Sequence, residues 1–177
     1  MSKWLSCILL IILLVGCAGD SNSEIPSTKN VDSLSTSSPS THDHEMLSVH
    51  IGDSVFRVVT AITPVDRTLG LSGRSSMPLN TGMLFVFETE EKFEFWMKDM
   101  EFSLDLIWID SDCYVTDLTK NAPPADNDSD VSDIISYAPK NPAQYVLEIN
   151  GGLVEILGIK EGEPVAFDLG IGESSEC

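Results

Sequence analysis

Two carboxylates lie among branched apolar side chains in segments that alternate like β-strands. Successive side chains of a strand point to opposite faces. Asp105 therefore shares its face with Ile107, and Glu148 shares its face with Val146. A carboxylate in such surroundings must be paired with a cation, hydrogen-bonded or protonated. Asp105 and Glu148 are thus the first candidates for chemistry.

Three interpretations of these carboxylates stay open. In the first, they form structural ion pairs or lie in water at strand edges. In the second, they form the polar side of a ligand cleft in which Arg74 binds an anionic or hydroxylated group. In the third, Asp105 and Glu148 act together as general acid and base. The cations available nearby are Arg67, Arg74 and Lys98.

Trp96 is the candidate for an aromatic contact. In a strand over residues 92–98, it would share a charged face, while the opposite face would be apolar. The Trp96 ring either stacks on a sugar or a base, or packs beneath a loop with its N–H hydrogen-bonded. The charged face carries Glu94, Trp96 and Lys98, and the apolar face carries Phe93, Phe95 and Met97. Ordinary core candidates nearby are Met83, Phe85, Phe87 and Trp108.

No motif predicts a cofactor or a metal. The acidic run that begins at Asp126 does not fit an EF-hand, because Val131 and Tyr137 stand where that loop needs glycine and glutamate. The acidic run is therefore interpreted either as a looser calcium contact or as a solvated acidic loop. Cys113 and Cys177 either form a disulfide bond or stay separate, since pairing needs geometry that the sequence lacks.

The elements that position these residues are mainly strands. Residues 47–51 and 55–62 predict a hairpin around Gly52-Asp53. Thr63-Pro64 predicts the start of a short helix, with threonine as the N-cap and proline in the first turn. Further strands are expected at 83–87, 92–98, 104–110, 114–120, 144–150 and 163–169, with a long loop at 121–142 and a second helix at 153–157. The prediction is a mainly β (α+β) fold, a compact barrel-like mixed sheet of about seven or eight strands with two short helices.

The N-terminal segment predicts an exported protein. Lys3 precedes an apolar stretch over residues 5–15 that is too short to span a bilayer and typical of a signal peptide. It ends in Leu14-Val15-Gly16-Cys17, which resembles the lipobox of bacterial lipoproteins and implies lipidation of Cys17. A plain signal peptide or an uncleaved anchor are the alternatives.

Composition divides the rest of the chain. A Ser/Thr-rich stretch predicts a disordered tether at 17–45. The tether follows the signal peptide at 1–16 and precedes one domain at 46–170 and a C-terminal tail at 171–177. The chain has 177 residues, with 10 basic and 28 acidic side chains and a net charge of −18. Such a charge argues against nucleic acid as a partner.

Several blocks in this order resemble domain-of-unknown-function family 192. The resemblance covers about residues 57–168, and its most specific parts are the G-M-L-F-V-F and F-W-M-K blocks at 82–87 and 95–98. Other matching blocks are Thr63-Pro64 to Gly70-Leu71, Leu104-Asp105, Asn121-Ala122-Pro123-Pro124 and Tyr145 to Asn150 before Gly152. The resemblance implies a small, mostly β fold of exported or anchored proteins and no particular activity.

We therefore expect an extracytoplasmic lipoprotein that is anchored to a membrane by acylated Cys17 and carries a small-ligand-binding module. The alternative is an envelope interaction or assembly factor, and a carboxylate-based hydrolase is a third class. The partners expected are the lipid bilayer and an unknown small molecule or envelope protein. The candidate ligand-binding residues are Arg74, Trp96, Lys98, Asp105 and Glu148, with no metal site and no cofactor.

Overall fold

The computed structural model describes residues 46–125, 135–169 and 177. The predicted signal, Cys17, the tether, the acidic run at 126–134 and most of the tail lie outside these residues. No helix in the described ranges is long and apolar enough to cross a bilayer.

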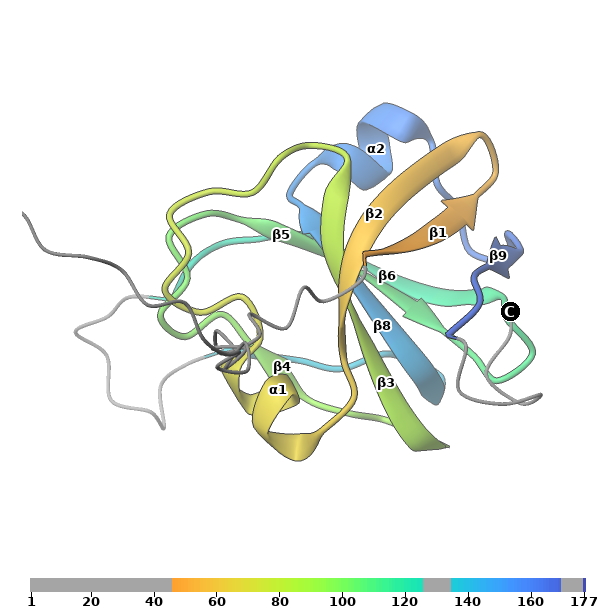
Figure 1. The fold of residues 1–177 in the computed structure, drawn as a ribbon, viewed down its shortest axis with the longest axis horizontal. Coiled ribbons are helices and arrows are strands. Elements are labelled where there is room, and N and C mark those ends of the chain that lie inside the picture. The colour runs from red at the N-terminus through yellow and green to blue at the C-terminus, as the bar shows by residue number, and fades with distance from the viewer. Residues whose placement is uncertain (1–45, 126–134, 170–176) are drawn as a thin grey trace, which may run out of the picture. The chain divides into compact units, whose positions relative to one another are not determined.

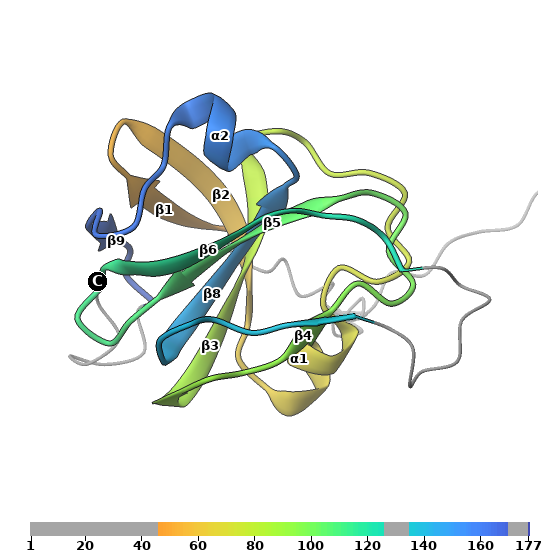
Figure 2. The same cartoon turned by 180° about the vertical axis from the view of Figure 1, so that it is seen from behind.

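The described residues form a curled half-barrel sheet of seven strands, in the order β6-β5-β8-β3-β2-β1-β9 (Figures 1 and 2). All neighbours in this sheet are antiparallel except β2 and β3, which are parallel and are joined through the helix α1. The elements are β1 (Leu47–Ile51), β2 (Ser54–Ala61), α1 (Pro64–Leu69), β3 (Thr81–Glu91), β4 (Phe95–Trp96), β5 (Leu104–Ile109), β6 (Val115–Ala122), β7 (Ser136–Tyr137), β8 (Ala143–Asn150), α2 (Leu153–Leu157) and β9 (Val165–Ala166). The predicted fold class is confirmed.

The central strands β5 and β8 are buried on both faces and separate two apolar cores. We call the two cores, one on each face of these strands, the barrel core and the pocket-side core. The barrel core includes Val49, Phe56, Ile107, Leu147 and Val154. The pocket-side core includes Leu71, Phe85, Met100, Leu106 and Val146. Alternation along β5 and β8 therefore decides which core each side chain enters.

The helix α1 forms as its local sequence predicts. The Thr63 hydroxyl accepts a hydrogen bond from Asp66 N at 3.2 Å, and the Asp66 carboxylate accepts one from Thr63 N at 3.3 Å. This reciprocal capping box satisfies two N–H groups at the start of the helix. The helix ends at Gly70, whose φ of 51° favours glycine. α1 is thus a short helix with a capped start that follows β2.

The two edges of the sheet are joined near the C-terminal end of the described chain. β9 pairs with β1 on one side. On the other side, Val165 N donates to Cys113 O at 2.8 Å, and Tyr114 bridges Pro164. Cys113 and Cys177 form a disulfide bond, which resolves the alternative that their spacing left open.

Two predicted strands are much shorter than expected. Within residues 92–98 only β4 is a strand, and it pairs with the two-residue strand β7. β7 itself lies inside the segment predicted to be a loop. The strand predicted at 163–169 is reduced to β9, which pairs with β1 over two residues.

Candidate functional site

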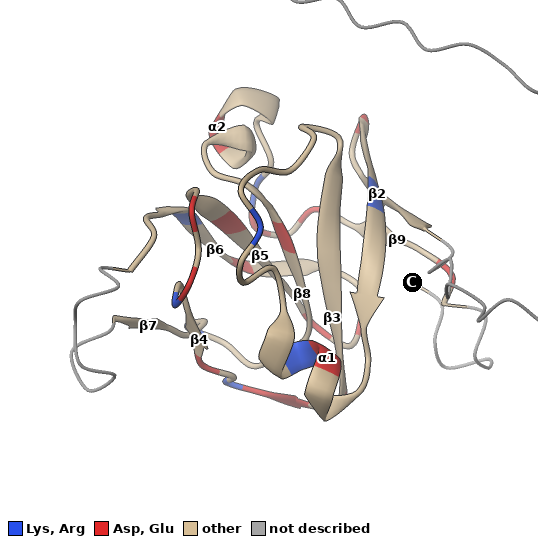
Figure 3. Ribbon diagram, turned by 60° about the vertical axis from the view of Figure 1, so that its left-hand side comes forward, with Lys and Arg blue, Asp and Glu red and all other residues tan. Residues whose placement is uncertain are grey.

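A cavity of about 370 Å³ opens between α1, the β4 segment and the sheet face formed by β3, β5 and β8. Figure 3 shows α1 in front of β3, with β4 beside it, and α1 carries both an acidic and a basic residue, Asp66 and Arg67. The residues that line the cavity are Pro64, Arg67, Thr68, Leu69, Gly70, Leu71, Ser72, Phe85, Phe87, Phe93, Glu94, Phe95, Trp96, Met100, Leu104 and Glu148.

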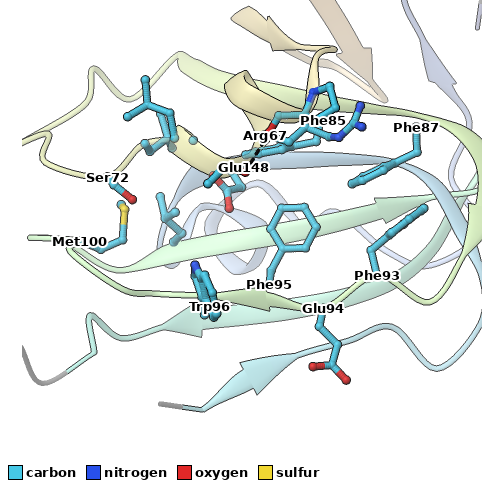
Figure 4. Close-up of a pocket in the computed structure, with 16 residues that line it drawn as sticks. Arg67, Ser72, Phe85, Phe87, Phe93, Glu94, Phe95, Trp96, Met100 and Glu148 are labelled. Carbon is cyan, nitrogen blue, oxygen red and sulfur yellow. Dashed lines mark hydrogen bonds between the residues drawn. The ribbon is translucent and has the colours of Figure 1, made fainter. Parts of the chain in front are cut away.

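Aromatic rings form much of the cavity wall (Figure 4). Phe87 and Phe93 are stacked with their centroids 3.6 Å apart. Phe85 and Phe95 meet edge to face at 4.9 Å. Trp96 lies at the mouth with 53% of its surface exposed. The wall therefore offers ring edges and faces from two strands and the segment between them.

Arg67 ties α1 to this wall. Its guanidinium lies 4.9 Å from the centroid of the Phe87 ring. Nη1 donates to Val86 O at 2.9 Å and to Ile62 O. The guanidinium is therefore bound to backbone of the protein itself. These hydrogen bonds hold α1 in its position over the sheet.

Glu148 is the buried acid of the cavity. Its side chain lies on the sheet face between Met83 of β3 and Leu106 of β5, its partners in the two ladders, and the residue is 5% exposed. Burial alone raises the pKa of its carboxyl from 4.5 to about 8. In the described part of the chain the Glu148 carboxyl has no hydrogen-bond or ion-pair partner. Every polar side-chain atom there that is completely enclosed does have a hydrogen-bond partner, so the Glu148 oxygens are not completely enclosed. The Glu148 oxygens are thus open to the cavity, as Figure 4 shows.

Asp105 lies on the opposite face of the sheet, which corrects its prediction as a cavity residue. In the register of β5 and β8, Asp105 stands opposite Ile149, while Glu148 stands opposite Leu106. Residues opposite each other share a face, and neighbours along a strand do not. The predicted Asp105–Glu148 pair therefore does not form.

The Asp105 carboxylate holds backbone instead. It accepts hydrogen bonds from Asn121 N at 2.6 Å, Gly152 N at 2.9 Å and Val154 N at 2.7 Å. These bonds join the end of β6 to the start of α2. Asp105 is fully buried, and its charge is compensated by N–H donors as a buried carboxylate requires.

The other predicted site residues are only partly brought together. Trp96 lines the cavity, as its candidate role requires. Lys98 does not line it, but pairs with Asp99 at 3.1 Å beside a neighbouring groove. Arg74 is exposed and lines neither space. Arg67 takes the place at the cavity that the sequence assigned to Arg74.

Sequence reasoning missed most of the aromatic wall. The sequence predicts Phe85 and Phe87 as core residues and places Phe93 and Phe95 on the apolar face of a strand; Phe85 does lie in the pocket-side core, and it also lines the cavity. The signal available was their number within the short stretch 85–96. No group of three or more His, Cys, Asp or Glu side chains that could hold a metal occurs within residues 46–125 and 135–169.

Comparisons with known proteins place this domain. The model of the DUF192 family, described as "Uncharacterized ACR", matches residues 47–167. The chain belongs to this family. The DUF192 domain thus includes every residue that lines the cavity.

Two crystal structures resemble the DUF192 domain. One is a protein of unknown function from Novosphingobium aromaticivorans, with 32% identity and a TM-score of 0.62, over 68% of this chain and 84% of that chain. The other, from Sinorhizobium meliloti, is described as a candidate transcription regulator, with 29% identity and a TM-score of 0.61, over 70% of this chain and 95% of that chain. No curated protein matches the chain.

Replacing Glu148 by glutamine should change how stability depends on pH. The wild-type carboxyl has a pKa of about 8 when folded and an ordinary value of 4.5, so between these values the native state binds more protons than the unfolded state. Wild-type stability is therefore lost as the pH rises through this window, by about 5 kcal/mol in all. Relative to wild type, Glu148→Gln should gain about that much unfolding free energy, measured by urea denaturation from about pH 4 to about pH 9. Glu94→Gln, at an exposed lining position, is the control and should stay parallel to wild type; a parallel Glu148→Gln curve would contradict the burial of this acid.

Asp105→Asn should destabilise the fold without altering the cavity. The amide has one acceptor oxygen, so at least one of the three N–H groups that Asp105 now holds loses its partner. Each lost partner costs about 1–3 kcal/mol, and we expect a loss of about 3 kcal/mol of unfolding free energy. Asp53→Asn, at an exposed turn position, is the matched control. Equal stabilities for the two variants would refute the structural role of Asp105.

Proposed function

We propose that this DUF192 protein is a lipid-anchored extracytoplasmic module that binds a small molecule in the aromatic cavity. The observation that carries the proposal is the Glu148 carboxyl, which is buried yet open to the cavity and without a partner among the described residues. A buried polar group without a partner costs stability. A ligand that hydrogen-bonds the carboxyl would compensate for that cost.

The size and lining of the cavity support this function. Small-molecule sites measure about 300–1,000 Å³ and combine apolar walls with a few polar groups that orient the ligand. The volume of about 370 Å³ suits a ligand the size of one or two rings. Phe87, Phe93 and Phe95 supply the apolar wall, and Glu148 supplies the polar group.

The location rests on the N-terminal sequence. The apolar stretch before Cys17 and the lipobox-like Leu14-Val15-Gly16-Cys17 favour export and acylation. Two acyl chains on one residue are enough for stable anchoring without basic residues. A tether over 17–45 would let the domain reach ligands away from the lipid surface.

An envelope interaction factor is the second candidate. Val65 and Leu69 on α1 are 76% and 64% exposed, and with Trp96 they border a groove next to the cavity. Exposed apolar patches of this kind can mark protein contacts. A hydrolase with paired carboxylates is not proposed, because Asp105 and Glu148 lie on opposite faces of the sheet.

Indole should bind the cavity, and Trp96 should contribute to its affinity. Indole is a neutral ring system with one N–H, which the Glu148 carboxyl can accept. Isothermal titration of the full chain in a nonionic detergent should give saturable binding, weakened about fivefold by Trp96→Ala because a ring contact contributes about 1 kcal/mol. Leu79→Ala, exposed and outside the cavity lining, is the control. Binding that is absent, or equal in Trp96→Ala, would favour the interaction factor.

Cys17→Ser should release the protein from membranes. In a bacterial host that processes lipoproteins, the wild-type chain should sediment with membranes and incorporate labelled palmitate. The variant lacks the thiol that accepts the lipid, so it should incorporate no label. Cys113→Ser, which removes a thiol used in the disulfide bond, is the control and should keep the label. Equal labelling of the Cys17→Ser protein would contradict anchoring at this residue.

A further inference from the structure

We infer that the cavity selects a small organic ammonium ion, with its nitrogen beside the Glu148 carboxyl and against the Phe95 and Trp96 rings. This inference rests on the proposed function and names the ligand class of the same cavity. Figure 4 shows the Glu148 carboxyl pointing into the space bordered by Phe95, Trp96 and Met100.

The polar groups of the lining leave the carboxyl as the group that a ligand must meet. Thr68 Oγ1 donates to Pro64 O at 2.8 Å, and Ser72 Oγ donates to Lys98 O at 3.2 Å. Glu94 points away from the ring cluster in Figure 4. The Glu148 oxygens are therefore the inward-facing acceptors without a partner in the described chain. Acceptors of this kind favour a ligand that carries donors and positive charge.

The aromatic wall favours the same charge. Ring faces carry negative electrostatic potential, so they attract a cation that lies within about 6 Å. Phe95 and Trp96 lie on the side of the cavity toward which the Glu148 carboxyl points (Figure 4). A cation placed there contacts rings and carboxyl together. The net charge of −18 over the whole chain also attracts cations and repels anions.

Arg67 leaves this end of the cavity free for a second cation. Its guanidinium lies over the Phe87 ring and is held by the carbonyl oxygens of Ile62 and Val86. No ion pair links it to Glu148 in the ranges that the structure describes. The arrangement thus separates a protein cation at Phe87 from a ligand site at Phe95.

Binding of an ammonium ion should release a proton. Burial raises the pKa of Glu148 to about 8, so the free cavity holds a neutral acid at neutral pH. The charged groups of the lining around it are Arg67 from α1 and Glu94 beside β4, while Met83 and Leu106, its partners in β3 and β5, carry no charge. An ammonium ion stabilises the carboxylate, so the carboxyl proton passes to the buffer. Affinity for the cation therefore rises with pH below 8, and affinity for a neutral ligand does not.

The test compares three probes that share one ring and differ in charge: benzylammonium, benzyl alcohol and benzoate. Isothermal titration uses the full chain in a nonionic detergent. Benzylammonium should bind at least about tenfold more tightly than benzyl alcohol, and benzoate most weakly. Its affinity should rise about tenfold from pH 6 to pH 7, with close to one proton released per ligand in buffers of different ionisation heat.

Glu148→Gln keeps the shape of the side chain and removes its charge. In this variant the preference for benzylammonium over benzyl alcohol should fall several-fold, to the part that the rings supply, and the pH dependence should disappear. Glu88→Gln, at an exposed position outside the cavity lining, is the matched control and should keep both. The proton count in the wild-type protein tests the same contact without any variant.

The outcomes separate the ligand class from the binding function. Benzyl alcohol that binds as tightly as benzylammonium, or a preference for benzylammonium that Glu148→Gln leaves unchanged, overturns the proposed ammonium ligand while the cavity keeps its binding role. Benzoate as the tightest ligand overturns it as well, in favour of an anion at Arg67. No binding of any of the three, nor of indole, overturns both proposals.

Discussion

The register of β8 between β3 and β5 is the constraint on which the rest of the domain depends. All three strands are hydrogen-bonded over the stretch that carries Glu148, with Met83 on one side and Leu106 on the other. Because side chains alternate, a shift of one residue would move Glu148 into the barrel core and Leu147 toward the cavity. The two apolar cores on either face of the sheet therefore fix the position of the buried acid.

The domain buries two carboxyls and treats them in opposite ways. Three backbone N–H groups surround Asp105, so the carboxylate is compensated and joins β6 to α2. Glu148 has no such donors in the described chain, and burial raises its pKa to about 8. A satisfied polar group makes a structure rigid, whereas an unsatisfied one costs stability. A buried carboxyl without a partner that lies next to a cavity is typical of a functional site.

The cavity exists because α1 is held away from the sheet at a defined place. The capping box fixes the start of the helix, and Arg67 ties it to the carbonyl oxygen of Val86 on β3. Aromatic side chains from β3 and the β4 segment then fill the space only partly. At the far edge, β9 and the Cys113–Cys177 disulfide bond hold the curled sheet closed. The site is thus built between one short helix and the face of the curled sheet.

The sequence by itself determined the local elements of this protein. The Gly52-Asp53 hairpin, the Thr63-Pro64 helix start and the helix at 153–157 depend on neighbouring residues, so short-range patterns were sufficient to predict them. Alternation also placed Glu148 on a face with Val146. The tertiary structure alone decided that Asp105 faces the other core, that Arg67 rather than Arg74 borders the cavity, and that four phenylalanines gather around it. These outcomes depend on register between strands far apart in the chain, which local patterns do not encode.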